Sequence, residues 1–353
     1  NDTDMEINEV IHWVTQLVIT SCLSNTVSKS YVTRIVNSDS ELCKLNIYLK
    51  SNKQSFDSMH ETHVNPLPST RGFQIYHWLP EKNEKEKMYP ASTTKIMTDL
   101  IICEQCNVLD RMRIPKEAVG IEGSSMYLQE GEVLTIQDLL YGMMLHSGND
   151  AAVALAIYCG GTVENFVQLM NDKVKALGLS NTHFENPNGL NAEEHYSSAY
   201  DLAMMSREAM KHEFFRELAG TKVWNASRSG ADNYNYFYNK NKTIFQYEGA
   251  TGIKIGYTQA AGRCLVASAR RNGMELIAVV LNDHNWFEDV YALFDYGFAS
   301  YDNVKIAEAE EVMIHADVSS GEKADVAVGA RQEVICPSLK GQKTDISLIY
   351  DID

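Results

Sequence analysis

The chain lacks three features that would each have assigned it to a class of protein. It has no basic excess, because 31 Lys and Arg stand against 47 Asp and Glu, for a net charge of −16. It has no basic block or basic stripe interleaved with aromatic residues, which argues against a nucleic-acid partner. No apolar run approaches the roughly 20 residues of a transmembrane helix. With 44% apolar residues, the sequence instead predicts a globular protein with its own core.

Cysteine is too scattered for a disulfide framework. The seven cysteines are an odd number, spread over the whole chain. Cys103 and Cys106 form the one close pair, with no second pair and no neighbouring His cluster. We interpret them as buried thiols rather than as a metal or redox site, and we expect no metal and no cofactor.

The first 70 residues carry no repeat and no motif. They mix short apolar patches with polar residues and run into Pro66 and Pro68. The most apolar early stretch, residues 10–23, is interrupted by polar side chains and preceded by acidic ones, so no signal peptide is visible. We therefore predict that residues 1–70 are an N-terminal extension that is mobile or only partly ordered.

From residue 72 onward, hydrophobic periodicity predicts an ordered mixture of strands and helices. Two apolar runs flank Asn272-Gly273, which is a strong hairpin pattern. Beyond residue 300 the chain turns to short alternating segments separated by Gly and Asp, typical of a second, β-rich region. We predict a catalytic domain over 71–300 and a partial β-rich domain over 301–353. The predicted strands are 73–78, 252–258, 264–269 and 274–281, and the predicted helices are 92–101, 135–145, 151–158, 166–177, 199–212 and 287–298.

The segment Pro90-Ala91-Ser92-Thr93-Thr94-Lys95 stands at the start of a predicted helix. Residues three apart lie on the same face of a helix, so Ser92 and Lys95 are predicted to stand side by side in its first turn. A hydroxyl beside an amine can be a nucleophile with its base. Taken alone, the pair fits equally well with a Ser cap followed by an ordinary Lys.

Two later segments favour the catalytic interpretation of Ser92 and Lys95. Ser147-Gly148-Asn149 lies in a predicted turn between two helices, and Lys254-Ile255-Gly256 lies on a predicted strand. In this order the three segments resemble the Ser-x-x-Lys, Ser-x-Asn and Lys-Thr-Gly elements of penicillin-recognising serine enzymes. The flanking sequence narrows the resemblance to the low-molecular-mass D-alanyl-D-alanine carboxypeptidases. The segments that carry it are 87–98, 124–128, 138–142, 147–152, 195–197, 256–258, 260–262 and 265–269.

The resemblance implies a fold, an activity and a location. The implied fold is α/β (α+β) and resembles the serine β-lactamases and transpeptidases. It has an antiparallel sheet flanked by helices, a helical subdomain and a short β-rich C-terminal region. The implied activity is removal of the terminal D-alanine from peptidoglycan stem peptides through an acyl-enzyme, with β-lactams as inhibitors. The family acts outside the cytoplasmic membrane and can end in an amphipathic membrane anchor. No such helix is visible here, so peripheral membrane association would depend on a segment that this sequence does not show.

The resemblance also implies a role for each catalytic residue. Ser92 would attack the carbonyl between the two D-alanines, and Lys95 would take its proton as a neutral amine. Burial near a second cation, Lys254, would lower the pKa of Lys95 and favour that neutral form. Ser147 would relay a proton to the departing D-alanine. Taken singly, each of these residues fits a structural role just as well.

The remaining implied roles concern substrate binding. Asn149 would hold the substrate amide, and Lys254 belongs to the element that recognises the substrate carboxylate. Gly256 would let the substrate backbone approach the strand closely. The backbone N–H groups of Ser92 and Tyr257 would form the oxyanion hole. His195 also lies in a matching segment, but the family mechanism uses no histidine there, so we interpret it as structural.

Besides its short C-terminal β-rich region, the sequence departs from the family pattern in two places. Position 255 is Ile where the family has Thr, which removes a hydroxyl that contacts the substrate carboxylate. Losing a hydrogen bond to a charged group, worth about 1.5–3 kcal/mol, lowers recognition by roughly ten- to a hundredfold. The family also has a strand where residues 65–68 here contain two prolines. Two alternatives therefore stay open: a catalytically impaired relative that only binds penicillin or peptidoglycan, and a serine β-lactamase.

Overall fold

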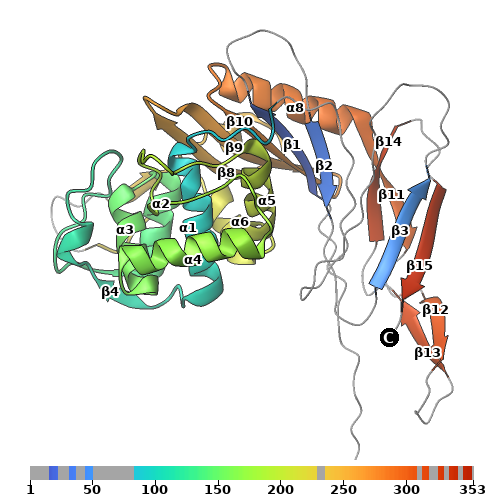
Figure 1. Cartoon of the computed structure of the whole chain (residues 1–353), viewed down its shortest axis with the longest axis horizontal. Helices are drawn as coiled ribbons and strands as arrows, with labels where there is room; N and C mark the ends of the chain where they lie inside the picture. The colour runs from blue at the N-terminus through green and yellow to red at the C-terminus, as the bar shows by residue number, and fades with distance from the viewer. Residues whose placement is uncertain are drawn as a thin grey trace, which may run out of the picture.

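A five-stranded sheet with helices on both faces forms the centre of the molecule (Figure 1). The computed structural model describes residues 16–22, 32–36, 44–50, 83–228, 235–307, 312–317, 325–329, 334–340 and 345–351. The strand order in the sheet is β2-β1-β10-β9-β8. These strands are β1 (Gln16–Cys22), β2 (Val32–Val36), β8 (Ala250–Thr258), β9 (Gly262–Arg271) and β10 (Met274–Leu281).

The antiparallel part of the sheet agrees with the sequence prediction. β9 and β10 are joined at Asn272 and Gly273, which have φ values of 50° and 79°. Positive φ at both positions is the two-residue turn whose twist suits a hairpin. All eight residues of β10 are buried, because helices cover both faces of this strand.

Three strands lie within residues 1–70, which the sequence predicts to be a mobile or partly ordered extension. β1 runs parallel to β10, from Gln16 opposite Glu275 to Cys22 opposite Leu281, and β2 pairs with its other edge. Residues 16–22 of the apolar stretch at 10–23 thus form a sheet strand. The predicted strand at 73–78 lies outside the described residues.

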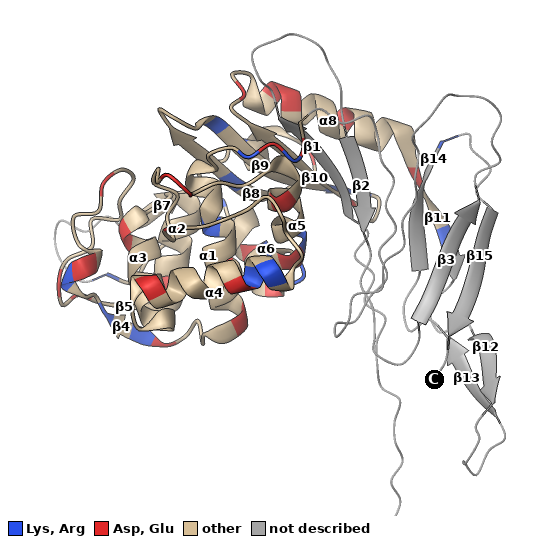
Figure 2. Cartoon of the chain, in the orientation of Figure 1, with Lys and Arg blue, Asp and Glu red and all other residues tan. Residues whose placement is uncertain are grey.

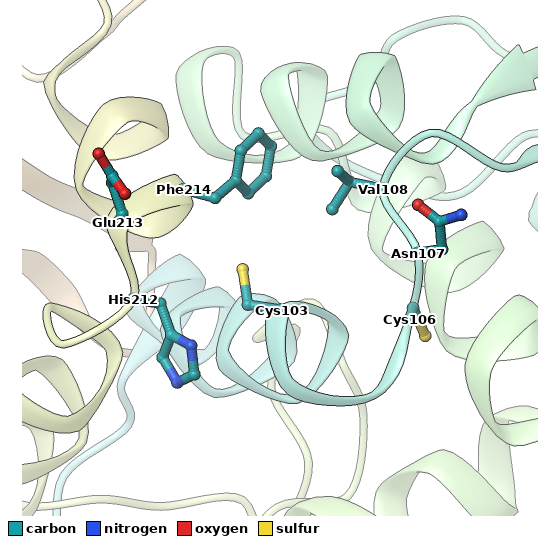
Figure 3. A pocket seen from close by; sticks show the side chains of 7 residues that line it. All are labelled: Cys103, Cys106, Asn107, Val108, His212, Glu213 and Phe214. Atoms are coloured by element: carbon teal, nitrogen blue, oxygen red, sulfur yellow. The ribbon is translucent and has the colours of Figure 1, made fainter. Parts of the chain in front are cut away.

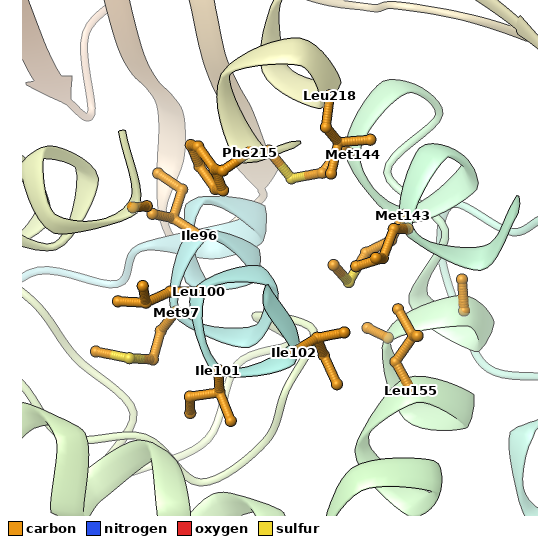
Figure 4. Packing of buried hydrophobic residues seen from close by; sticks show 14 of the residues in the cluster. Ile96, Met97, Leu100, Ile101, Ile102, Met143, Met144, Leu155, Phe215 and Leu218 are labelled. Carbon is orange, nitrogen blue, oxygen red and sulfur yellow. The ribbon is translucent and has the colours of Figure 1, made fainter. Parts of the chain in front are cut away.

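Helix α1 (Lys95–Gln105) lies between this sheet and the other helices of the lobe (Figure 4). Its side chains Ile96, Met97, Leu100, Ile101 and Ile102 are each 1% exposed or less. They point outward around the whole helix, towards residues of helices α2, α3 and α6. Every residue of α1 from Lys95 to Ile102 is buried, and this burial fixes the residues at its N-terminal end.

The helical subdomain is built from capped helices, as predicted. The side chain of Thr135 accepts a 3.0 Å hydrogen bond from the N–H of Asp138, which begins α2 at the expected residue. One predicted helix is shorter than expected, because 199–212 ends at Ala209 and a separate helix follows. The helices are α2 (Ile136–Leu145), α3 (Asn149–Gly160), α4 (Val163–Ala176), α5 (Ala199–Ala209), α6 (Glu213–Gly220) and α7 (Thr243–Gln246).

Short elements connect these helices. Two small ladders border the helical subdomain, and two 3₁₀ turns precede α1 and β5. Among the described residues, no single helix is long and apolar enough to cross a membrane; α3 and α4 reach that length only together, across an 84° bend. The short elements are η1 (Ala91–Thr94), β4 (Arg111–Arg113), η2 (Lys116–Ala118), β5 (Val133–Thr135), β6 (Val223–Asn225) and β7 (Tyr236–Tyr238).

Helix α8 (Trp286–Ser300) covers the opposite face of the sheet with Phe287 and Phe294, as its spacing predicted. Figure 2 shows acidic residues along α8 and both signs of charge interspersed over the helical lobe. The chain turns to strands directly after Ser300, and Figure 1 shows them at the end of α8 remote from the helical lobe. They form separate ladders, β11 with β14, β12 with β13, and β15 with the N-terminal β3. These strands are β3 (Lys44–Lys50), β11 (Tyr301–Ala307), β12 (Val312–Asp317), β13 (Asp325–Gly329), β14 (Val334–Leu339) and β15 (Asp345–Asp351).

Candidate active site

Ser92 lies in the tight η1 turn that leads into α1. Ala91 has a φ of 48°, in the left-handed region that non-glycine residues rarely adopt. The hydroxyl of Thr93 donates a 2.7 Å hydrogen bond to the carbonyl of Pro90, which closes the turn. Such backbone strain persists only where the surroundings hold it, and it is common at functional sites.

Two glycines allow the surrounding chain to approach this turn. A Cβ on Gly189 would lie 1.8 Å from the carbonyl oxygen of Ala91, so only glycine fits there. A Cβ on Gly256 would lie 2.9 Å from the backbone nitrogen of Ser92. The sheet strand β8 and the loop at 186–189 therefore pack directly against the backbone of the candidate nucleophile.

The Lys95 side chain points at the Ser92 hydroxyl. Its Nζ lies 2.9 Å from Ser92 Oγ, 2.7 Å from Asn149 Oδ1 and 2.6 Å from the carbonyl oxygen of Asn188. The last two partners are carbonyl oxygens, which can only accept. A neutral amine has two N–H groups for them and one lone pair left. In that neutral form the lone pair would be directed at Ser92 Oγ, which is the geometry of a base beside its nucleophile.

The charges around Lys95 favour its neutral form. Complete burial lowers the pKa of Lys95 well below its usual value, and the neighbouring Lys254 and Lys240 ammonium groups lower it further, against the Asp150 carboxylate, which raises it. Burial, and then Lys240, lower the pKa of Lys254 to about 7. Lys240 was not identified from the sequence, since nothing in the run 239–242 distinguishes one lysine from the other.

The turn between α2 and α3 brings in the second predicted segment. Ser147 is buried and has a φ of 68°, so its backbone is in the left-handed region. The Nδ2 of Asn149 donates a 2.6 Å hydrogen bond to the carbonyl of Glu122, and this contact leaves Oδ1 facing Lys95. The structure thus joins Lys95 and Asn149 directly. Ser147 lies in the same turn, two positions before Asn149 in the chain.

Asp150 is a positioning residue that the sequence interpretation missed. It is completely buried, and its two carboxylate oxygens accept hydrogen bonds from Ser125 Oγ, Met126 N–H and Leu128 N–H. These contacts hold the loop 124–128 beside Asn149, whose own N–H donates to the Ser124 carbonyl. Its place directly after Ser147-Gly148-Asn149 was the available clue, but an acid in the first turn of a helix usually faces solvent.

Strand β8 carries the third segment at the edge of the sheet. Lys254 is 1% exposed, whereas the Tyr257 side chain is 65% exposed. Ile255 packs against the apolar cluster beneath α8, on the opposite face of the sheet from Gly256. Neither nearby hydroxyl replaces the missing Thr, because Thr251 Oγ1 is bonded to Ser268 Oγ at 2.7 Å and Thr258 Oγ1 donates to Asn191 Oδ1 at 3.0 Å.

His195 supports the site without facing the nucleophile. Its Nδ1 accepts a 3.0 Å hydrogen bond from the N–H of Glu185, so Nε2 carries the proton and donates to Thr94 Oγ1 at 2.8 Å. Burial lowers the pKa of His195 to about 4, so the imidazole is neutral at pH 7. Within the described residues, no group of three or more His, Cys, Asp or Glu side chains could hold a metal ion.

Fold and site together define the class of protein. A Ser-x-x-Lys turn at the junction of a sheet and a helical subdomain, faced by an Asn from an inter-helix turn and a Lys on an edge strand, is the arrangement of the penicillin-recognising serine enzymes. The chain belongs to the D-alanyl-D-alanine carboxypeptidase family, whose model matches residues 77–285. The fold class predicted from the sequence is therefore confirmed, with one difference: β1 joins the sheet parallel to β10.

Individual relatives agree with this assignment. The chain is 36% identical over 272 residues to the D-alanyl-D-alanine carboxypeptidase DacF of Bacillus subtilis, covering 75% of this chain and 70% of that protein. Its structure is similar to that of penicillin-binding protein 5 from Haemophilus influenzae, with a TM-score of 0.63 and 29% identity over 82% of this chain and 85% of the other. It is also similar to the Streptomyces K15 DD-transpeptidase, with a TM-score of 0.59 and 33% identity over 63% and 92% of the two chains.

Proposed function

We propose that this protein is a serine-type D-Ala-D-Ala carboxypeptidase that removes the terminal D-alanine from peptidoglycan stem peptides through an acyl-enzyme on Ser92. The observation that carries the proposal is the hydrogen-bond set of Lys95. Its two carbonyl partners leave the third position of the amine for Ser92 Oγ, 2.9 Å away. Membership of the family supplies the substrate class.

Acylation begins when Ser92 Oγ bonds to the carbonyl carbon between the two D-alanines and its proton passes to Lys95. The negative charge that develops on the carbonyl oxygen is met by the backbone N–H groups of Ser92 and Tyr257. The carbon–nitrogen bond then breaks, and Ser147 relays a proton to the leaving D-alanine amine. The close approach of Gly256 to the Ser92 N–H supports this placement of the oxyanion hole.

Substrate binding uses the edge of β8 and the inter-helix turn. Asn149 holds the substrate amide, and the Lys254 ammonium attracts the free carboxylate at the substrate terminus. Water then hydrolyses the ester and releases the shortened stem peptide. β-Lactams acylate Ser92 by the same route, since their strained amide stands in for the D-Ala-D-Ala bond.

The substrate also suggests where the protein works and how it is divided. We place it in the bacterial cell envelope, outside the cytoplasmic membrane, because peptidoglycan is assembled there. We assign catalysis to residues 71–300 and a separate β-rich domain to residues 301–353. The change from helix α8 to strand β11 at Ser300 and Tyr301 supports that boundary.

A paired assay tests the proposal. Wild-type protein and a Ser92→Ala variant are incubated with a labelled penicillin and, separately, with a pentapeptide that ends in D-Ala-D-Ala. We expect a mass adduct on Ser92 and release of free D-alanine from the wild type, and neither from the variant. Thermal melting of both proteins checks that the variant is folded.

Other results would point to the competing functions. An adduct without D-alanine release would mean a penicillin-binding relative that has lost turnover. Rapid multiple turnover of penicillin would mean a β-lactamase. No adduct on folded wild-type protein would refute nucleophilic catalysis by Ser92 altogether.

A further inference from the structure

A buried arginine, Arg228, holds the loop that lies beside Asn149. It follows strand β6, in a part of the chain to which the sequence interpretation assigned no role. Its Nη1 donates a 2.7 Å hydrogen bond to the carbonyl of Met126, and its Nη2 donates a 3.2 Å hydrogen bond to the carbonyl of Tyr127. The two carbonyls lie 102 and 101 positions earlier in the chain, so sequence spacing gives no sign of this contact.

Glu132 fixes the orientation of the Arg228 guanidinium group. Its Oε1 accepts a 2.7 Å hydrogen bond from Nε, and its Oε2 accepts a 2.9 Å hydrogen bond from Nη2. Two parallel hydrogen bonds to one carboxylate set the plane of the guanidinium as well as its position. The arginine and glutamate side chains are 2% and 13% exposed, so solvent screens this ion pair weakly.

Asp150 holds the same loop from its other side. Its carboxylate accepts hydrogen bonds from the N–H groups of Met126 and Leu128, at 2.9 and 3.0 Å. The segment 124–128 has no regular secondary structure, and Tyr127 has a φ of 58°. A bulky residue keeps a left-handed backbone only where its surroundings impose it. Two buried charged side chains, Asp150 on the N–H groups and Arg228 on the carbonyls, therefore determine the conformation of this loop.

The loop reaches the candidate site at Gly148 and Asn149. The N–H of Asn149 donates a 2.7 Å hydrogen bond to the carbonyl of Ser124. A Cβ on Gly148 would lie 3.0 Å from Met126 Cγ, so the Met126 side chain packs against the turn itself. A displacement of the loop is therefore transmitted to Asn149, whose Oδ1 lies 2.7 Å from the Lys95 amine.

We propose that Arg228 is a positioning residue for the candidate site, which it supports by holding Asn149 through the loop 124–128. Asn149 in turn orients the Lys95 amine beside the nucleophile. The inference rests on the proposed acylation of Ser92. Arg228 is not a catalytic residue, because it acts through the loop.

The experiment compares Arg228→Met in two backgrounds of the full chain, wild type and Asn149→Ala. A displacement of about 1 Å costs about a hundredfold in rate, so acylation of wild-type background by labelled penicillin should slow by about ten- to a hundredfold. In the Asn149→Ala background the same change should alter the rate by less than about twofold, because the residue through which Arg228 acts is already gone. A side chain that only stabilised the fold would slow both backgrounds by the same factor.

Phe214→Ala is the matched control for lost stability. Phe214 lines a pocket of about 290 Å³ at the C-terminal end of α1, the end opposite to Ser92 (Figure 3). Its ring centroid lies 6.2 Å from that of Tyr141, so the truncation removes packing within the helical lobe and leaves the hydrogen bonds of the loop 124–128 in place. This variant should unfold at a lower temperature, yet its acylation rate while folded should stay that of wild type.

Glu132→Gln is the second variant, and it decides the question if Arg228→Met does not fold. It weakens the bidentate pair and keeps the side-chain shape, so it should slow acylation in the wild-type background and not in the Asn149→Ala background. Hydrogen exchange gives a readout that does not depend on acylation. The amide hydrogens of residues 126–128 should exchange faster in Arg228→Met than in wild type, and at the wild-type rate in Phe214→Ala.

Three results would overturn the proposal. The first is a folded Arg228→Met variant that is acylated as fast as wild type. The second is equal slowing in the two backgrounds, which would mean that Arg228 does not act through Asn149. The third is unchanged hydrogen exchange of residues 126–128. Failure of wild-type protein to be acylated would instead refute the proposed function, and the exchange measurement would still show whether Arg228 holds the loop.

Discussion

The two faces of the central sheet pack against different kinds of side chain. The face toward α1 holds fully buried polar groups, among them Lys95, Asp99 and Lys254, each with nearby charges or hydrogen bonds. The face toward α8 is an apolar cluster in which Leu265, Leu276 and Phe294 are completely buried. Burying polar groups is costly unless they are paired, so the site face depends on its hydrogen bonds, whereas the α8 face supplies hydrophobic stabilisation.

Two adjacent residues of strand β8 face these two different environments. Gly256 faces the η1 turn, where a side chain would collide with the Ser92 backbone, and Ile255 packs on the α8 side. A substitution on one face should therefore change the chemistry, and one on the other should change the stability. The following predictions separate these effects.

Lys95→Met is expected to have the largest effect. It keeps an unbranched side chain of similar length but removes the amine, so no base stands 2.9 Å from Ser92 Oγ. Because a positioned general base contributes up to about 10⁴-fold, acylation by labelled penicillin should slow by about 10³–10⁴-fold. Stopped-flow or quenched labelling measures the rate, and the thermal melt should change little because a buried charge is replaced by an apolar group. A loss of less than tenfold in a folded variant would show that Lys95 is not the base.

Phe294→Ala probes the opposite face. Phe294 is 0% exposed, and its ring centroid lies 5.1 Å from that of Tyr247. Truncating a buried Phe costs about 3–5 kcal/mol in the free energy of unfolding. Denaturant unfolding should show this loss, while penicillin acylation at a temperature where the variant is folded stays within twofold of wild type. A large fall in the acylation rate of the folded variant would contradict the separation of stability from chemistry, because it would mean that the two faces are coupled.

Ile255→Thr tests whether a residue that packs on the α8 face can nevertheless contribute to substrate binding at the edge of β8. The hydroxyl adds a donor beside the edge of β8, and a hydrogen bond to a carboxylate is worth about 1.5–3 kcal/mol. We expect D-alanine release from a D-Ala-D-Ala peptide to rise by about tenfold. Ile255→Val is the matched control, since it removes apolar atoms without adding a hydroxyl and should leave the rate unchanged. An unchanged or lower rate for the Thr variant, or an equal rise for Val, would refute the carboxylate contact.

The sequence predicted those parts of the fold that follow from local pattern. The Asn272-Gly273 hairpin, the Thr135 cap and the apolar spacing of α8 all depend on residues close to one another in the chain. The strand β1 could not be found in that way. Its pairing with β10 joins segments more than two hundred residues apart, and its own composition is ambiguous between several structures.

The site was predictable to a similar extent. The ordered segments identified the candidate nucleophile, base and amide, which the structure brings together in one set of hydrogen bonds. Asp150 and Lys240 were missed because each acts through burial and distance, which sequence spacing does not show.

The pH dependence of acylation is the smallest predicted effect and the most direct test of charge on the site face. The pKa of Lys254 is lowered to about 7, so raising the pH from 7 to 8 converts its ammonium from about half charged to about one-tenth charged. Since kcat/KM reports the free enzyme, acylation by a penicillin with a free carboxylate should fall by about fivefold over that interval. The methyl ester of the same penicillin has no charge to lose at Lys254, and its rate should stay level or rise as any remaining protonated Lys95 becomes neutral. Equal alkaline losses for the acid and the ester would mean that Lys254 does not bind the carboxylate, and that its charge acts only on Lys95.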